Sequence, residues 1–471
     1  MPAGAREVFR SFVEQLQDHI HPNTAEILAC DESSAETLLH AAQLLSGDLQ
    51  ASSSRYGAGN TGLKNLLQHA HAAMASSSAK QLRGWRRVYT DACILLACQD
   101  VLDFWVSREA TRALSAVSHL DHAIVIAGAA GDGRLDLVLD LIEGIQSECL
   151  DRPAAARGDS FFLAPIRDTP AVTPRSLPTA ENAVRCLDAP PSLASFLSRY
   201  SQEPFVLRGF LGDWPALNEH PWASLDYLRS AAGPGRMVPV EVGGDYRSDD
   251  WTQRMMPWEE FLASIGNMSS VEPRPVLYLA QHSLFKQFPA LQSDIIVPDY
   301  VYSSLSPPKN YPQYVPPSNE EQLVLNAWLG PASTVSPAHT DPFFNFYAQV
   351  VGRKTIWLAP PVASPHIYPY PPPSSKESGV NLTCDKSEPI PRNPAANHES
   401  PSMSNTTRVD VFPSSPDELA MSHGEFPDFW DKVVPAAMSV TLEPGDLLFF
   451  PPGWWHAMRS EEMSFSVSMW F

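Results

Sequence analysis

The chain has 471 residues, a length that suits two domains better than a single core. Hydrophobic residues make up 44% and aromatic residues 10%, which is typical of a folded protein. The formal net charge of −20, from 33 basic and 53 acidic side chains, argues against sequence-independent nucleic-acid binding, which needs Lys and Arg. A basic protein or peptide is the more suitable partner, although the acidity could also serve solubility alone.

Five charged residues interrupt the first twenty positions: Arg6, Glu7, Arg10, Glu14 and Asp18. This stretch therefore has neither the continuous apolar region of a secretory signal nor the acid-free composition of a transit peptide. No apolar run approaches the length that spans a bilayer. We expect an intracellular protein, nuclear or cytoplasmic, that is not secreted and has no membrane partner. The six cysteines are scattered and indicate neither a disulfide framework nor a zinc site.

Apolar residues recur at helical spacing through residues 5–147, among them Phe9, Phe12, Val13, Leu16, Leu38, Leu45, Val88, Leu95, Leu102, Val138, Leu141 and Ile142. This period predicts an all-α domain of five to seven helices, which we place at residues 1–160. The glycine-rich residues 128–133 superficially suggest a phosphate loop. They lack the lysine and the preceding strand that such a loop needs, so a turn between helices is the simpler interpretation.

Four prolines mark residues 161–182 as an interdomain linker: Pro165, Pro170, Pro174 and Pro178. Proline removes a backbone donor and fixes φ, which suits an extended connection. Residues 183–471 then contain many short β-branched and aromatic runs separated by turn residues. This pattern favours a double-sheet jelly roll, so the predicted fold class is α+β, with the helical domain first.

Within the β-rich domain, residues 362–435 form a segment that is heavy in Pro, Ser and Asn. Such a composition cannot bury enough apolar surface to offset the ordering of the chain. We interpret the segment as a surface insertion, disordered in part, that either covers the entrance of a site or is inert.

A candidate metal site begins with His339 and Asp341. Side chains two apart on a strand point to the same side, so one short piece of backbone offers two ligands. His456, which follows a Pro-Pro-Gly turn, offers a third. Two histidines and one carboxylate are the ligands of non-haem Fe(II) oxygenases. Zinc is the competing metal, but no cysteine lies close in sequence, and each histidine alone could be structural.

The residues after His339 continue as two apolar runs, 346–351 and 355–358, and Gly352 breaks them, which predicts a hairpin or tight bend. Lys354 lies at the start of the second run. A lysine there is costly to bury without an anionic partner.

Ordered motifs connect these residues to a known family: Ala327-Trp328-Leu329-Gly330, Ser336-Pro337, His339-x-Asp341, Asn345, Gly352-Arg353-Lys354, Trp455-His456 and Ser464-Phe465-Ser466-Val467-Ser468. Together they resemble the JmjC-domain Fe(II)- and 2-oxoglutarate-dependent oxygenases. The chain is most similar to the branch named lysine demethylase eight, whose members are protein arginyl hydroxylases. The resemblance runs from about residue 190 to the last residue, apart from the insertion.

The resemblance implies a double-stranded β-helix that binds Fe(II), 2-oxoglutarate and O2 and releases succinate and CO2. His339, Asp341 and His456 would hold the iron, and Lys354 would anchor the distal carboxylate of 2-oxoglutarate. Further contacts to the co-substrate would come from Tyr278, Ser336, Asn345 and Trp470. Tyr278 and Ser336 could instead serve packing or a strand end, and Trp470 could be a core residue.

Glu241 is the candidate for substrate choice, because it stands on an apolar strand where an acid is rare unless it is paired or lines a cleft. A carboxylate accepts a guanidinium through two parallel hydrogen bonds. Three aromatic residues would flank such a flat cation: Tyr246, Trp251 and Trp328. Glu241 could also be an edge-strand residue that faces water. Phe343 and Phe344 replace polar amides of the family, which leaves the peptide substrate open.

The sequence is compatible with three functions. An arginyl hydroxylase is favoured by Glu241 and its aromatic neighbours. A histone lysine demethylase of the same superfamily would prefer an aromatic cage for methylated ammonium, and the sequence has no zinc-finger pattern. A non-catalytic cupin-like scaffold would need neither the complete ligand set nor Lys354.

Overall fold

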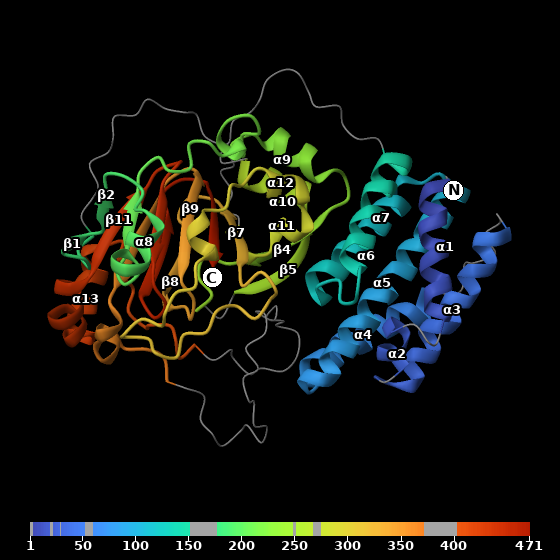
Figure 1. Ribbon diagram of the computed structural model, residues 1–471, viewed down its shortest axis with the longest axis horizontal. Helices are drawn as coiled ribbons and strands as arrows, with labels where there is room; N and C mark the ends of the chain where they lie inside the picture. The colour runs from blue at the N-terminus through green and yellow to red at the C-terminus, as the bar shows by residue number, and fades with distance from the viewer. Residues whose placement is uncertain are drawn as a thin grey trace.

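The computed structural model describes residues 3–18, 22–28, 30–51, 60–150, 177–247, 251–266, 275–371 and 403–471. Figure 1 shows a helical part, coloured blue to teal, beside a part built on β-sheets, coloured green to red. The predicted α+β class is confirmed. Residues 161–176 of the predicted linker and residues 372–402 of the predicted insertion lie outside the described residues, and the domain boundaries stay predictions.

The helical part consists, in the described residues, of α1 (Ala3–Gln17), α2 (Pro22–Leu28), α3 (Glu32–Ala51), α4 (Asn60–Ser76), α5 (Ala79–Ser107), α6 (Ala110–Ala127) and α7 (Arg134–Cys149). The 29-residue α5 packs against α2, α3, α4, α6 and α7, and its Val88, Ile94 and Leu95 are fully buried. The apolar residues that recur at helical spacing in the sequence therefore form the buried faces of these helices. None of the helices described combines the length and apolar character needed to cross a membrane.

Two β-sheets form the second part. The larger sheet has the order β2 (Arg185–Leu187), β3 (Phe205–Leu207), β12 (Leu447–Phe450), β9 (Asn345–Val351), β14 (Ser464–Trp470), β7 (Val324–Gly330), β6 (Leu277–His282), β4 (Met237–Val242) and β5 (Thr252–Pro257). The smaller sheet has the order β1 (Asn182–Ala183), β11 (Met438–Leu442), β10 (Lys354–Ala359), β13 (Trp455–Ser460) and β8 (Val335–Thr340).

The sheets pack face to face, because one buried cluster contains Tyr347 of β9 together with Ile356 and Leu358 of β10. This is the predicted double-stranded β-helix. β9 and β10 do not pair as a hairpin. Gly352, with φ +66, bends the chain from one sheet into the other, and a Cβ at this position would lie 2.1 Å from the Met463 carbonyl oxygen. The sequence predicted either a hairpin or a tight bend at Gly352, and the tight bend is correct. The reason is that consecutive strands of a jelly roll can belong to different sheets.

Alternation along β9, β14 and β7 separates the two faces of the larger sheet. Phe346, Val467 and Leu329 belong to an outer core, whereas Tyr347 and Trp328 belong to the cluster between the sheets. Helices contribute to the outer core and cover that face: α9 (Leu225–Ala232), α10 (Trp258–Gly266), α11 (Leu284–Gln287) and α12 (Pro289–Ser293). The inner face is the one that can reach a site between the sheets.

A buried ion pair attaches the helical part to the larger sheet. Arg236, directly before β4, donates to both carboxylate oxygens of Asp121 of α6, from Nε at 2.9 Å to Oδ2 and from Nη2 at 2.8 Å to Oδ1. The backbone N–H of Met237 donates to Asp121 Oδ2 at 2.7 Å. Gln146 of α7 adds bonds to the carbonyls of Ala232 and Pro234, at 3.1 and 2.8 Å. The start of β4 is therefore held by the helices.

The expectation that the insertion lacks a core is wrong for the described residues 403–435. This stretch contains α13 (Pro416–Glu425). Its Val409, Phe429 and Val433 are fully buried and pack in one cluster with Trp357 of β10. The average composition hid these few apolar residues, which cover the outer face of the smaller sheet.

Candidate metal centre

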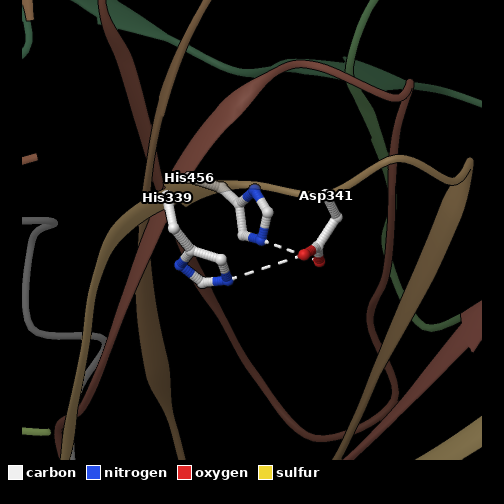
Figure 2. Close-up of side chains that lie close together, drawn as sticks. All are labelled: His339, Asp341 and His456. Carbon is white, nitrogen blue, oxygen red and sulfur yellow. Dashed lines mark ion pairs between the residues drawn. The ribbon is translucent and has the colours of Figure 1, made fainter. Parts of the chain in front are cut away.

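Three potential ligands of a metal converge between the sheets. His339 lies near the end of β8, Asp341 directly follows that strand, and His456 is the second residue of β13. β8 and β13 are antiparallel neighbours, and their register places His456 directly opposite His339. The ligand atoms of the three side chains lie within 4.8 Å of one another (Figure 2). The pairing of two strands thus joins residues that are far apart in the chain.

Backbone carbonyls fix the orientation of both imidazoles. His339 Nδ1 lies 2.7 Å from the Pro337 carbonyl oxygen, and His456 Nδ1 lies 3.0 Å from that of Trp454. A carbonyl oxygen only accepts, so each Nδ1 carries the proton and each Nε2 presents a lone pair. His456 Nε2 is 3.3 Å from Asp341 Oδ2, and His339 Nε2 is 3.9 Å from Oδ1. This tautomer is the one that binds metals through Nε2.

The turn before β13 connects the ligands through the backbone. Gly453, with φ +77, donates its N–H to the Asp341 carbonyl oxygen at 2.9 Å. A Cβ at Gly453 would lie 2.5 Å from Cδ2 of Tyr311, so only glycine fits this turn. The turn brings Asp341 and His456 together. Two imidazole nitrogens and a carboxylate oxygen fit Fe(II).

Lys354, the first residue of β10, is 1% exposed. Its Nζ donates to the hydroxyls of Tyr347, at 3.0 Å, and Tyr278, at 3.4 Å. Among the described residues no carboxylate lies within ion-pair distance of this amine. Burial lowers the pKa of Lys354 to about 7. A buried amine with two neutral partners fits a ligand that brings its own carboxylate.

The other predicted co-substrate residues surround these two positions. Burial raises the pKa of Tyr278 well above its ordinary value. A hydrogen bond with Ser336 of β8 acts in the opposite direction and lowers this pKa. Asn345 of β9 pairs with Trp470 of β14, and both side chains are buried. Asn345 Oδ1 and Trp470 Nε1 have no hydrogen-bond partner among the described residues.

Two residues on the inner face of the larger sheet were not predicted from the sequence as parts of the site. Tyr347, which holds Lys354, lies two residues after Asn345, and Asn326 lies two residues before Trp328. Because side chains two apart share a strand face, extending the period of two from Asn345 and Trp328 could have found both.

The predicted substrate residues occupy the neighbouring end of the larger sheet. Glu241 of β4 pairs in register with Tyr278 of β6, and its Oε2 accepts a hydrogen bond from Trp251 Nε1 at 3.2 Å. The Trp328 ring lies 6.2 Å from that of Tyr278, and its Nε1 donates to Ser468 Oγ at 3.0 Å. The structure thus brings Glu241, Trp251 and Trp328 to one region around Tyr278.

Tyr246 contacts the C-terminal part of the insertion. Its hydroxyl lies 3.3 Å from Thr406 Oγ1. Thr406 forms an antiparallel bridge with His339, and the Thr340 N–H donates to the Asn405 carbonyl oxygen at 3.0 Å. This short stretch therefore runs along the free edge of β8, directly beside a candidate metal ligand. Residues 405–406 of the insertion thus contact the strand of a candidate ligand, and whether the insertion covers the entrance of the site or is inert stays a prediction.

Comparisons with known proteins agree with this geometry. Residues 195–471 match the family described as cupin-like domain. The chain is 33% identical over 394 residues to lysine-specific demethylase 8 of Danio rerio, covering 82% of this chain and 81% of that protein. It is 35% identical over 309 residues to Jumonji C domain-containing protein 5 of Drosophila melanogaster, covering 64% of this chain and 63% of that protein.

A third relative is more distant. The bifunctional peptidase and (3S)-lysyl hydroxylase JMJD7 of Homo sapiens is 27% identical over 348 residues, which are 70% of this chain and 91% of that protein. The family match over residues 195–471 includes all three potential ligands, His339, Asp341 and His456. The chain therefore belongs to the cupin-like JmjC family, the oxygenase family that its motifs resemble.

Proposed function

We propose that this enzyme is an Fe(II)- and 2-oxoglutarate-dependent dioxygenase that hydroxylates an arginine side chain of a basic protein. The iron, when bound, supplies the activation of O2, one atom of which enters a substrate C–H bond while the other oxidises 2-oxoglutarate to succinate and CO2. The single observation that supports arginine is the carboxylate of Glu241, oriented by Trp251 beside the co-substrate residues.

Each residue of the centre has a distinct part in this proposal. His339 and His456 bind through Nε2, since their Nδ1 protons are held by carbonyls, and Asp341 adds one negative charge. The ammonium of Lys354 pairs with the distal carboxylate of 2-oxoglutarate, and Tyr347 and Tyr278 fix that ammonium. An anionic partner raises the pKa of Lys354 from its low value, so binding favours the charged amine.

Recognition of arginine follows from geometry and charge. A guanidinium presents parallel N–H donors that match a carboxylate, and its flat faces stack on aromatic rings. The bond from Trp251 Nε1 fixes the plane of the Glu241 carboxylate. Trp328 and Tyr246 are the further aromatic candidates for stacking. The net charge of −20 supports a basic protein as the partner.

A lysine side chain is the second candidate target, because two relatives carry lysine in their printed names, as a demethylase and as a lysyl hydroxylase. A carboxylate also pairs with an ammonium, but as a point charge without the bidentate match. The two candidates differ in the product that they form.

The test incubates purified enzyme with Fe(II), 2-oxoglutarate and a library of basic peptides, followed by mass spectrometry. Gain of one oxygen on arginine supports the proposal. Gain of one oxygen on lysine, or loss of a methyl group from methyl-lysine, contradicts the arginine assignment. Glu241→Gln keeps the shape of the side chain and removes its charge, so it should lower arginine turnover at least about tenfold.

The metal assignment has its own control. His339→Ala should abolish succinate formation and weaken Mn(II) binding, which equilibrium dialysis measures without turnover. His366→Ala removes a histidine that lies outside the centre and should change neither. Succinate formation that persists in His339→Ala would refute the proposed centre.

A further inference from the structure

Asn326 of β7 is a buried amide without hydrogen bonds. The residue is 0% exposed, and neither Oδ1 nor Nδ2 has a partner among the described residues. Leaving a buried amide unpaired costs about 1–3 kcal/mol for each group, so such residues are rare in stable cores. Asn326 has no part in the proposed binding of iron or 2-oxoglutarate.

The strand register places Asn326 on the inner face of the larger sheet. Its flanking residues Leu325 and Ala327 pack with the outer core, whereas Trp328, two residues on, packs with the cluster between the sheets. Side chains two apart share a face, so Asn326 points inward with Trp328. It also lies directly opposite Ser468 of β14, the residue that accepts a bond from Trp328.

Other unsatisfied polar atoms lie next to it. Trp470 is two residues after Ser468 on the same inner face, and it pairs with Asn345 on β9. Trp470 Nε1 and Asn345 Oδ1 are also buried without partners among the described residues. Three adjacent strands, β7, β14 and β9, therefore present unsatisfied hydrogen-bonding groups on one inner surface. This surface lies near the candidate metal centre, because Asn345 pairs with Phe450, and the Phe450 ring lies 4.7 Å from the His456 ring.

A second buried amide shows what a structural role looks like. Gln349 of β9 is also 0% exposed, yet its Nε2 donates to the carbonyls of Val351 and Gly352, at 2.7 and 2.9 Å. Its Oε1 accepts from Ser466 Oγ at 2.8 Å. Gln349 closes the bend between the sheets. The Asn326 amide forms no hydrogen bond within the described chain, which points to a ligand as its partner.

We propose that Asn326 is a further substrate-contacting residue, whose amide oxygen accepts a hydrogen bond from an N–H of the target side chain and so orients its C–H bond towards the metal centre. This inference rests on the proposed function, and it adds a residue that selects how the basic side chain lies once Glu241 has captured it.

The order of strands favours the target side chain over the distal end of 2-oxoglutarate. β7 lies between β14, which carries Trp470, and the β6–β4 pair, which carries Tyr278 and Glu241. The anchor for the distal carboxylate, Lys354, is held by tyrosine hydroxyls and not by Asn326. Asn326 thus lies on the strand between that of Trp470 and those of Tyr278 and Glu241, and it is not a hydrogen-bond partner of the Lys354 amine.

The experiment compares Asn326→Leu, which removes both amide groups at similar size, with Gln349→Leu as the matched control. Thermal unfolding of the metal-free proteins should show an equal or higher Tm for Asn326→Leu. Gln349→Leu should lose about 5 °C, since it leaves two carbonyls and a hydroxyl unpaired. Asn326→Ala removes the amide without adding atoms and replaces the leucine variant should that one fail to fold.

The functional readout is the amount of hydroxylated peptide formed per succinate, with the peptide that the wild type oxidises. We expect this ratio to fall about tenfold or more in Asn326→Leu, while the KM for 2-oxoglutarate stays unchanged. A binding assay without turnover titrates N-acetyl-arginine methylamide into protein loaded with Mn(II) and 2-oxoglutarate, and Asn326→Leu should weaken it by a similar factor.

Failure of the inference and failure of the proposed function give different results. An unchanged ratio and unchanged probe binding in Asn326→Leu, or a Tm loss like that of Gln349→Leu, overturns the role of Asn326. If the wild type binds N-acetyl-lysine methylamide and not the arginine probe, the arginine assignment fails. A loss of lysine-probe binding in Asn326→Leu then still supports Asn326 as the substrate contact.

Discussion

Arg236 and Lys354 are both buried basic side chains, but only Arg236 has a carboxylate partner within the described residues. Arg236, at the junction of the helices and the larger sheet, is 5% exposed and is matched by Asp121, with a further bond from Nη2 to the Gln287 carbonyl oxygen at 2.7 Å. Lys354, between the sheets, is 1% exposed and has only the hydroxyls of two tyrosines.

The difference separates structure from function. A buried charge that is paired and fully hydrogen-bonded fixes one arrangement of the chain, as Arg236 fixes helix α6 against β4. A buried amine without a counter-charge lowers the stability of the protein alone and is retained where a ligand supplies the charge. We expect the two cations to respond oppositely to removal.

Arg236→Met should give the largest change in stability. The substitution leaves the carboxylate of Asp121 buried without its partner, which costs about 3–5 kcal/mol for a broken buried pair. Denaturant unfolding measures the loss of free energy. Since Arg236 lies outside the metal centre, succinate formation per folded molecule should be retained.

The double variant Asp121→Leu with Arg236→Met is the matched control for that loss. It removes both charges, and replacing a buried pair by apolar residues is often neutral or stabilising. Recovery of most of the stability would show that the unpaired carboxylate causes the defect. A single variant as stable as the wild type would show that the junction does not depend on this pair.

Lys354→Met should change stability in the opposite direction and by less, with a gain of about 1–3 kcal/mol at pH 7 in the absence of ligand. The folded protein lowers the pKa of Lys354 from its ordinary value of 10.5 to about 7. Between these values the unfolded chain binds one more proton, so the stability of the wild type rises with pH. The gain from Lys354→Met should therefore be largest below pH 7 and vanish towards pH 10.

Binding of 2-oxoglutarate should be coupled to protonation of the Lys354 amine. At pH 8 the amine of Lys354 is mostly neutral, and pairing with a carboxylate requires that it take up a proton. Affinity should fall about tenfold per pH unit above pH 7, and calorimetry in buffers of different ionisation enthalpy should count about one proton taken up at pH 8 and almost none at pH 6. Lys354→Met should bind weakly and without this dependence. A pH-independent affinity in the wild type would contradict the anchor.

The sequence predicted these regions unequally, and the reason is the range of the interactions. Spacing of two placed His339 and Asp341 on one side of a strand, and the Pro-Pro-Gly turn indicated His456. A period in the sequence reports which residues share a face. It does not report which strands pair, and the register of β8 with β13 is what makes the three ligands meet.

Residues whose role depends on a distant partner were missed for the same reason. Asp121 and Arg236 are ordinary charged residues in their local sequence, and only the packing of α6 on β4 joins them. The composition of the insertion failed in another way. Its average polarity concealed Val409 and Phe429, which are buried because the smaller sheet offers them an apolar face.

The smallest expected effect concerns Tyr347, which holds Lys354 from the strand that also carries Asn345. Tyr347→Phe removes one acceptor, bonded at 3.0 Å, and leaves the amine with Tyr278 alone. Loss of a bond to a charged group should cost about 1.5 kcal/mol, equivalent to about tenfold weaker binding of 2-oxoglutarate at pH 8. Tyr300→Phe is the matched control, because its hydroxyl donates to the Pro191 carbonyl away from the centre. Titration of both variants with 2-oxoglutarate and Mn(II) should separate them. If Tyr300→Phe weakens binding as much as Tyr347→Phe, the effect reflects loss of a buried hydroxyl in general, and Lys354 does not depend on Tyr347 for its charge.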